Sequence, residues 1–358
     1  MPSQGVGHEA PGVSGSNSTV PSSEMTCRIC GNAEHNRSFR AKEMMFGSRE
    51  EFGYVECATC GTVQIAEIPS NLGKYYPANQ YFSLAPPRKA TRGVVHRMME
   101  DLQFWAFAEP SLDPAGGWYR LLCSLDLTEP GVEAVGRTNV RRDARVLEVG
   151  CGNGRLLRLL ARLGFAQLEG IDPFLPGDVY EAGVSLRKRD VGDLDRAAFY
   201  DLIVLYHSLE HAPDPIATLR SVAAHMSRDG VVVVAMPVVN TAFRQYGVHW
   251  YQLDPPRHLH VFSVKGFEIA LARSGLRLGG RYFNSTAAQF RISEAYTRDV
   301  ALAEIPPPRF SFGRARFPEF LTRREARYRS HAHALNAAAE GDQAVFYLRR
   351  GPETVSAV

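Results

Sequence analysis

Two cysteine pairs of identical spacing carry the clearest chemical signal in this chain of 358 residues. They read CRICG at 27–31 and CATCG at 57–61. A Cys-x-x-Cys-Gly turn points both sulfurs at one centre, and two such turns supply the four soft ligands of a tetrahedral Zn²⁺. Two redox pairs or unrelated buried thiols would not explain the glycine after each pair. The sequence therefore predicts a closed, structural zinc site formed by Cys27, Cys30, Cys57 and Cys60.

A glycine-rich stretch, VLEVGCGNG at 146–154, lies where a predicted strand runs into a helix. Its alternating glycines, which let the backbone approach a ligand closely, are Gly150, Gly152 and Gly154. A dinucleotide fingerprint needs a glycine at position 155, which is arginine, and Glu148 would repel a pyrophosphate. S-adenosylmethionine (SAM) instead carries a sulfonium, an ammonium and a ribose. Glu148 suits such a cation, and Asp172 is placed to bind the ribose hydroxyls.

Two histidine-rich stretches supply candidate bases for proton removal near pH 7. HSLEH at 207–211 matches an inverted zinc-peptidase signature, but Pro213 follows it at once, so the long helix which that chemistry needs cannot form. HWYQLDPPRHLH at 249–260 holds two prolines and is open to three interpretations, namely a metal site, a substrate wall or a packed turn. The candidate catalytic residues are His207, His211 and His258.

The end of the second stretch is an extended His-x-His segment, which sends alternate side chains to opposite faces. We therefore expect His258 to face the acceptor while His260 packs or caps, which disfavours a metal site made by this pair. Arg257 could pair with Asp254 or with an acidic group of a substrate. An apolar wall is expected from Trp250 and Tyr251.

From residue 145 onward, alternating strand and helix patterns predict βαβ units and a mostly parallel sheet, which brings these groups to one edge. Strands are predicted at 145–150, 167–172, 184–190, 201–207, 231–237, 276–283 and 343–350. The last strand follows a long insertion and is expected to be antiparallel. Helices are predicted at 154–164, closed by Gly164, at 215–230, capped by Asp214, and at 265–273.

Composition divides the chain into four parts. We expect a disordered Gly/Ser/Pro-rich tail at 1–25, a zinc ribbon at 26–66, a Tyr- and Pro-rich connector with helices at 67–142, and a catalytic domain at 143–358 with a helical insertion at about 284–342. Within the connector, helices are predicted at 89–108 and 116–127, and a polar linker at 129–143. Seven arginines between Arg309 and Arg329 form either a solvated basic face or an attractive surface for an anionic substrate.

Bulk properties exclude several classes of protein. The net charge of +3 gives no general case for binding nucleic acid or membranes. The longest apolar run, at 231–239, is about half the length of a membrane span, and the N-terminus does not read as a secretory signal. We therefore expect a cytoplasmic protein. The sequence does not specify the oligomeric state.

The glycine turn, Glu148 and Asp172 together resemble the class I SAM-dependent methyltransferases, over about 143–283 and the last strand. The resemblance implies an α/β fold with a Rossmann-like seven-stranded sheet and helices on both faces, preceded here by a small zinc-binding β ribbon and a helical connector. It also implies that Glu148 and the glycines line the methionine end of SAM. Asp172 would bind the ribose, and Asp190 would approach the adenine.

HSLEH also resembles the E-x-x-E-H segment of ubiquinone-pathway O-methyltransferases, whose acidic and histidine side chains are associated with a divalent cation. His207 stands where that pattern has Glu, so a second metal at Glu210 and His211 and a purely structural role for both side chains remain open. The N/D-P-P-Y motif of many amino-methylating enzymes is absent after the fourth strand.

The order of ribbon and catalytic domain resembles bacterial methyltransferases from polysaccharide and secondary-metabolite clusters, including zinc-carrying sugar C-methyltransferases. In that group the N-terminal part covers the active site, so Tyr76 or Tyr81 could reach the substrate or could pack in an interdomain hinge. We therefore expect methyl transfer from SAM to O, N or C of a small-molecule acceptor, namely a sugar, a polysaccharide precursor or a secondary metabolite, with zinc as a structural metal. The alternatives are an RNA or protein methyltransferase that uses the ribbon for recognition, and a non-catalytic SAM-binding protein.

Overall fold

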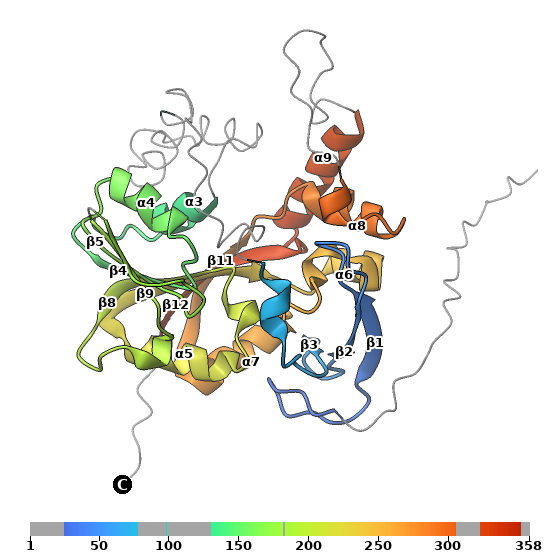
Figure 1. The fold of residues 1–358 in the computed structure, drawn as a ribbon, viewed down its shortest axis with the longest axis horizontal. Helices are drawn as coiled ribbons and strands as arrows, with labels where there is room; N and C mark the ends of the chain where they lie inside the picture. The colour runs from blue at the N-terminus through green and yellow to red at the C-terminus, as the bar shows by residue number, and fades with distance from the viewer. Residues whose placement is uncertain (1–24, 78–97, 99–129, 182, 306–322, 352–358) are drawn as a thin grey trace, which may run out of the picture.

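The computed structural model describes residues 25–77, 98, 130–181, 183–305 and 323–351 (Figure 1). Apart from Met25 and Met98, the expected tail and the two connector helices lie outside these residues, as does Tyr81. No helix in the described part of the chain is both long and apolar enough to cross a membrane.

The larger sheet is mostly parallel, as the alternating pattern predicts. Its strands, in the order in which they lie side by side, are β11 (Leu276–Phe283), β12 (Gln343–Arg350), β9 (Met226–Pro237), β8 (Tyr200–Tyr206), β4 (Arg145–Val149), β5 (Gln167–Ile171), β7 (Val184–Arg187) and β6 (Val179–Glu181). Strand β12 runs antiparallel between β9 and β11, which confirms the expected last strand. The seven expected strands are present, and β6 adds an unexpected antiparallel edge strand.

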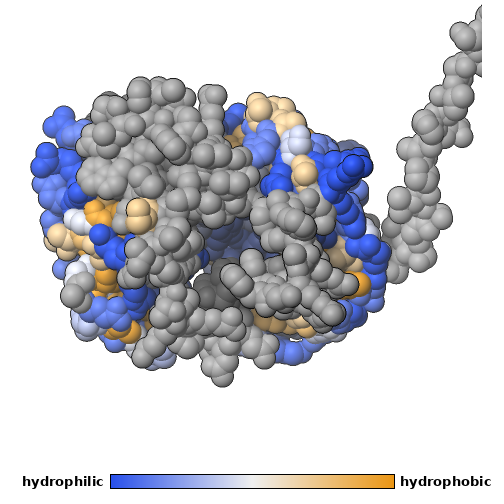
Figure 2. Space-filling view, turned by 90° about the horizontal axis from the view of Figure 1, so that it is seen from above, coloured by the Kyte–Doolittle hydropathy of each residue, from blue (hydrophilic) through white to orange (hydrophobic). Residues whose placement is uncertain are grey.

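Helices cover both faces of this sheet (Figure 1). The described helices are α3 (Pro130–Gly136), α4 (Arg155–Arg162), α5 (Pro215–Ala224), α6 (Thr241–Tyr246), α7 (Val264–Ser274), α8 (Ala288–Tyr296) and α9 (Arg323–Ala337). Helices α3 and α4 pack on one face, and α5 and α7 pack on the other. Seen from above, hydrophilic side chains occupy most of both flanks of the described surface (Figure 2).

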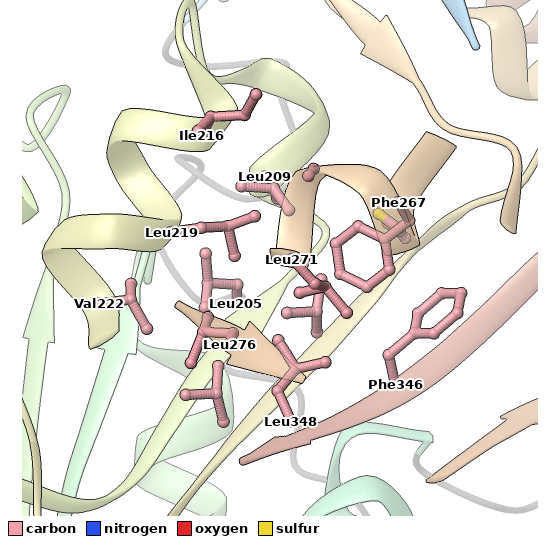
Figure 3. Packing of buried hydrophobic residues seen from close by; sticks show 14 of the residues in the cluster. Leu205, Leu209, Ile216, Leu219, Val222, Phe267, Leu271, Leu276, Phe346 and Leu348 are labelled. Carbon is pink, nitrogen blue, oxygen red and sulfur yellow. The ribbon is translucent and has the colours of Figure 1, made fainter. Parts of the chain in front are cut away.

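The core under α5 and α7 is a continuous apolar layer (Figure 3). Leu219 of α5 and Leu271 of α7 meet Leu205 of β8 and Leu348 of β12 there, and each is at most 2% exposed. Full burial of one such side chain stabilises a fold by about 1.5–3 kcal/mol. This layer holds β8 and β12 in place, and the candidate site lies at the ends of these strands.

Two sequence expectations in this domain are wrong. The polar linker expected at 129–143 contains α3, whose Val132 and Val135 are at most 1% exposed, because its small and branched residues form an apolar face against α4. The helix expected to end at Gly230 ends at Ala224, and β9 begins at Met226, since Met226 pairs directly with β8.

The ribbon is not a self-contained module. Its sheet consists of β1 (Arg37–Lys42), β2 (Glu51–Glu56), β3 (Val63–Ile65) and β10 (His260–Val261). Strand β10 belongs to the HWYQLDPPRHLH loop of the catalytic domain and runs antiparallel to β3. The backbone N–H of Ile65 also donates to the Leu259 carbonyl at 2.9 Å. The end of this loop, called the histidine loop below, therefore forms one strand of the ribbon sheet.

A buried ion cluster joins the same two parts. Arg257 is 0% exposed and donates to the carboxylates of Asp254 and Glu43, at 2.6 and 2.8 Å. Burial alone would raise the pKa of Glu43, but the N–H groups of Phe46 and Ser48 and the Arg257 guanidinium hold it below its usual range. The ribbon thus supplies a fixed negative charge that compensates a buried cation of the loop.

We predict that Glu43→Ala lowers the free energy of unfolding by about 3–5 kcal/mol, because it leaves Arg257 buried with one counter-charge removed. The matched control is Glu51→Ala, which removes an exposed partner of Arg40 and should change stability by about 1 kcal/mol or less. Urea unfolding measures both values. Equal effects of the two substitutions would contradict the assignment.

Candidate functional site

The glycine turn follows β4 and contacts the segment that follows β8. This segment, residues 207–211, is called the lip below. Gly150 has a φ of +74°, and a Cβ placed there would lie 2.4 Å from the Cβ of Ser208. The Ser208 hydroxyl in turn donates to the Val149 carbonyl at 2.8 Å. Only glycine allows this approach, so the expected cofactor turn and the HSLEH lip lie directly against each other.

Asp172 fixes the shape of the glycine turn from the end of β5. Its two carboxylate oxygens accept hydrogen bonds from the backbone N–H groups of Gly152 and Phe174, at 2.9 and 2.8 Å. Each carboxylate oxygen keeps a second lone pair that could accept from a ribose hydroxyl. Asp190, in contrast, is exposed and caps a short helical turn, so its contact with an adenine remains a prediction.

Glu148 is a buried carboxyl group that lacks compensation. It is 5% exposed, and its Oε2 has no hydrogen-bond partner in the described part of the chain. Burial, with a further contribution from the Asp172 charge, raises the pKa of Glu148 to about 8. A cationic ligand next to it would supply the missing partner, so the residues present fit the methionine end of SAM.

The lip after β8 holds His207 and Glu210. His207 has a φ of +52°, and its Nδ1 lies 3.2 Å from Glu210 Oε1. Burial alone would raise the pKa of Glu210, but its bond to His207 and the neighbouring histidines lower it to about 2. Glu210 is 0% exposed and its Oε2 has no partner among the described side chains. The lip therefore holds a buried carboxyl group whose pKa is lowered by its histidine neighbours and whose second oxygen is free among the described residues.

His211 and His258 share one tautomer. His211 Nδ1 lies 2.9 Å from the Arg257 carbonyl oxygen, and His258 Nδ1 lies 2.7 Å from that of Gln252. Because a carbonyl only accepts, each Nδ1 carries the proton and each Nε2 offers a lone pair. The ring centroids are 4.8 Å apart. Burial, then the nearby His211, lowers the pKa of His258 to about 4, so that ring stays neutral near pH 7.

Three ligand atoms converge at this point. Glu210, His211 and His258 each offer one atom, and these atoms lie within 4.8 Å of one another. One carboxylate and two imidazoles are a donor set that suits a divalent transition metal, which would act there as a Lewis acid. If a metal binds at Glu210 and His211, His258 could be its third ligand. His260 is not part of this group of ligand atoms.

Three further residues of the loop are buried in contacts with the rest of the protein. His260 is 0% exposed, and its Nδ1 lies 3.2 Å from the Ala212 carbonyl oxygen, as expected for a packed or capping side chain. Arg257 is fully buried and pairs with Asp254, one of its two expected partners, and with Glu43. Trp250 is 1% exposed in the core shared with the ribbon, so the expected apolar wall is wrong for Trp250.

Tyr76 connects the connector to the site. Its hydroxyl lies 3.1 Å from His211 Nδ1 and 3.4 Å from the Arg257 carbonyl oxygen. Its ring stacks on Phe174, two residues after Asp172, at a centroid distance of 5.6 Å. Tyr76 therefore bridges the expected cofactor strand and the histidine pair. The contributions of Glu43 and Gln252 were not expected, because their partners are distant in the sequence or are backbone atoms.

The four ribbon cysteines come together as predicted. Sγ of Cys27 lies 3.7 Å from that of Cys60, and Sγ of Cys30 lies 3.5 Å from that of Cys57. Zn–S bonds of about 2.3 Å in a tetrahedron place sulfurs about 3.8 Å apart, so the cluster fits a zinc ion. Both Cys-x-x-Cys turns contact α7. Arg273 of α7 donates to the Ile29 carbonyl, and Lys265 of α7 donates to the Thr59 carbonyl.

Comparison with known proteins agrees with this geometry. A family model described as a methyltransferase domain matches residues 126–278. A ubiquinone biosynthesis O-methyltransferase of Xanthomonas axonopodis pv. citri is 40% identical over 153 residues, covering 38% of this chain and 63% of that protein. Another, of Rhodopseudomonas palustris (strain BisB5), is 29% identical over 169 residues, covering 42% and 66%. The chain thus spans less than two thirds of the length of these relatives.

A solved S-adenosylmethionine dependent methyltransferase from Mesorhizobium loti aligns with a TM-score of 0.38 and 16% identity, covering 62% of this chain and 98% of that one. The family match, which covers less than half of the chain, indicates a methyltransferase domain over residues 126–278. The mostly parallel sheet, completed by antiparallel β12 from beyond the matched range, and the glycine turn after β4 agree with the class I, SAM-dependent type.

We predict about one zinc per chain by elemental analysis of freshly purified protein, and loss of that zinc in Cys60→Ser. Because Cys27, Cys57 and Cys60 belong to the apolar core that also contains α7, zinc loss should lower the melting temperature of the whole chain in a single transition. Cys151→Ser, outside the cluster, is the control and should retain zinc. A wild-type content well below one zinc per chain would contradict the ribbon assignment.

We also predict an acid sensitivity between pH 6.5 and 4. Burial lowers the pKa of both His258 and His260 from 6.5 to about 4, so the unfolded chain takes up protons that the folded chain refuses. The contribution of these two histidines to stability is therefore full above pH 6.5 and is lost as the pH drops toward 4. His260→Gln should make this decline in melting temperature shallower, whereas the exposed control His333→Gln should leave it unchanged. An unchanged slope in His260→Gln would contradict the burial effect.

Proposed function

We propose that this protein transfers the methyl group of SAM to an oxygen atom of a small-molecule acceptor. The observation that carries the proposal is the convergence of Glu210 and His211 from the lip with His258 from the histidine loop, on the lip that touches the glycine turn. The names of the two relatives, both ubiquinone biosynthesis O-methyltransferases, support oxygen as the acceptor atom. Glu148, the glycines and Asp172 would hold SAM, as expected from the sequence.

Methyl transfer is an in-line displacement, so positioning is the main task of the enzyme. The acceptor oxygen attacks the methyl carbon, the carbon–sulfur bond breaks, and S-adenosylhomocysteine leaves. His211 Nε2 would take the hydroxyl proton, because its Nδ1 proton is fixed on the Arg257 carbonyl and its ring is partly exposed. His258 is more deeply buried and would orient His211 and the acceptor rather than remove the proton. His207 would act through Glu210.

The ribbon has a structural role in this proposal. Its basic side chains Arg37 and Arg40 pair with Glu56 and Glu51 on the neighbouring strand, and one edge of its sheet is occupied by β10. These pairings leave the ribbon little free charge for nucleic-acid recognition. We infer that the zinc ion stabilises the ribbon and, through β10, the histidine loop.

SAM binding should be micromolar by titration calorimetry and should release close to one proton per SAM near pH 7. The proton comes from Glu148, whose pKa of about 8 in the free protein falls when the SAM cation arrives. Comparison of two buffers with different ionisation enthalpies measures this release. Asp172→Ala should weaken binding by about 10- to 100-fold, and the exposed control Asp178→Ala should not. Absence of SAM binding would end the proposal.

His211→Gln should lower kcat by about 100-fold or more with SAM affinity unchanged within twofold, because a general base typically contributes 10²–10⁴-fold. The assay follows transfer of radiolabelled methyl from SAM to a panel of hydroxylated small molecules. His333→Gln, which changes an exposed side chain of α9, is the control. A larger loss in His258→Ala than in His211→Gln would transfer the base role to His258. If a chelator abolishes methyl transfer while the ribbon keeps its zinc, the result would favour a metal at Glu210, His211 and His258 over a histidine base.

A further inference from the structure

Unpartnered buried polar atoms gather at the end of the large sheet where the site lies. Five side chains there hold such atoms, judged over the described residues: Glu148, Glu210, Asn284, Gln289 and Asp342. A folded protein leaves few buried polar groups without a partner, so such a gathering indicates a place where a ligand or ordered water completes the hydrogen bonds. Glu148 belongs to the proposed SAM site, and Glu210 belongs to the group of ligand atoms that it forms with His211 and His258. The other three are not.

These three side chains come from segments that the fold brings together. Asn284 directly follows β11, Asp342 directly precedes β12, and Gln289 lies in the first turn of α8. The Asn284 N–H donates to the Gln343 carbonyl at 3.1 Å, which ties the first two together. Gln289 lies one helical turn before Ser293, whose hydroxyl accepts from the Tyr251 N–H at 3.1 Å.

The same segments border the histidine loop. Trp250 Nε1 donates to Asp342 Oδ2 at 3.0 Å, and Gln252 Nε2 donates to Gln343 Oε1 at 3.2 Å. Gln252 is also the residue whose carbonyl holds His258 Nδ1. Since β12 is antiparallel, its beginning lies at the carboxyl ends of β8 and β9, beside the lip. The three side chains therefore lie on the acceptor side of the candidate site.

Burial makes the free atoms costly. Asp342 is 1% exposed and Gln289 is 0% exposed, yet Asp342 Oδ1 and Gln289 Oε1 lack partners, as do both amide atoms of Asn284. The hydrogen-bond partners of these side chains among the described residues are uncharged: Trp250 Nε1 donates to Asp342 Oδ2, and Gln289 Nε2 donates to the Thr286 carbonyl. The free atoms thus offer three acceptors and one donor group. That combination matches hydroxyl groups on several sides of a ligand, and it does not match a phosphate or carboxylate.

We propose that Asn284, Gln289 and Asp342 form an acceptor subsite that binds a neutral, hydroxyl-rich aliphatic group, such as a sugar ring, and so selects the substrate class. The proposal rests on the proposed methyl transfer for its role but not for its geometry. A phenolic acceptor would present one or two hydroxyls and an apolar ring, and would leave buried acceptors on the remaining sides unpaired.

The test is ligand-observed saturation-transfer NMR on the full chain saturated with S-adenosylhomocysteine. The probes are methyl α-D-glucopyranoside and catechol. The wild type should give signals from the glucoside, and Gln289→Met and Asn284→Leu should lose about fivefold or more of that signal. Gln167→Met, which removes an exposed amide at the opposite end of β5, is the matched control and should behave as the wild type.

Melting temperatures separate this role from a structural one. Removing an unpaired buried carbonyl should leave the melting temperature of Gln289→Met equal to or above that of the wild type while glucoside binding falls. A wild-type signal from catechol but not from the glucoside would overturn the subsite, as would variants that keep full glucoside binding, which would assign the free atoms to water alone. Failure to bind S-adenosylhomocysteine in the same sample would instead contradict the proposed function.

Discussion

The buried guanidinium of Arg257 is the constraint on which the arrangement of the site depends. A fully buried cation is tolerated only where fixed negative charges and hydrogen-bond acceptors surround it. Asp254 comes from its own loop and Glu43 from the ribbon, and a third contact runs from Nη1 to the Tyr75 carbonyl at 3.4 Å. The Arg257 carbonyl, meanwhile, fixes His211. One residue therefore joins the ribbon, the connector and the lip, so their positions are set together.

This coupling lets the small cysteine ribbon hold side chains of the candidate site in place, although the ribbon lies outside the matched methyltransferase domain. The ribbon sheet takes β10 as its last strand, and the Tyr54 hydroxyl donates to the His258 carbonyl at 3.0 Å. The backbone from the His258 carbonyl to Val261 is thereby held by the ribbon. The glycine turn touches Ser208 on the same lip, so the cofactor side and the acceptor side share one rigid support. Methyl transfer needs such rigidity, because it depends on alignment more than on charge chemistry.

Much of this could be predicted from the sequence, and the rest could not for physical reasons. Periodicity located the strands of the large sheet, and spacing identified the cysteine cluster and the glycine turn, because these signals are local. The pairing of β10 with β3 and the bond between Glu43 and Arg257 join residues about 200 positions apart, and no local pattern encodes them. Helix α3 was missed because a short run of small apolar residues does not distinguish a buried helix from a linker. Trp250 was misplaced because aromatic residues line sites and cores alike.

The central claim is that the ribbon holds the histidine loop and lip in place, and hydrogen exchange measured by mass spectrometry on Glu43→Ala tests it most directly. The account predicts faster exchange of backbone amides in residues 206–212 and 249–261 as well as in the ribbon, with β4 and β5 unchanged. The Glu51→Ala variant should exchange like the wild type. Faster exchange confined to residues 37–66 would contradict the account, because it would show that the ribbon and the histidine loop are stabilised independently.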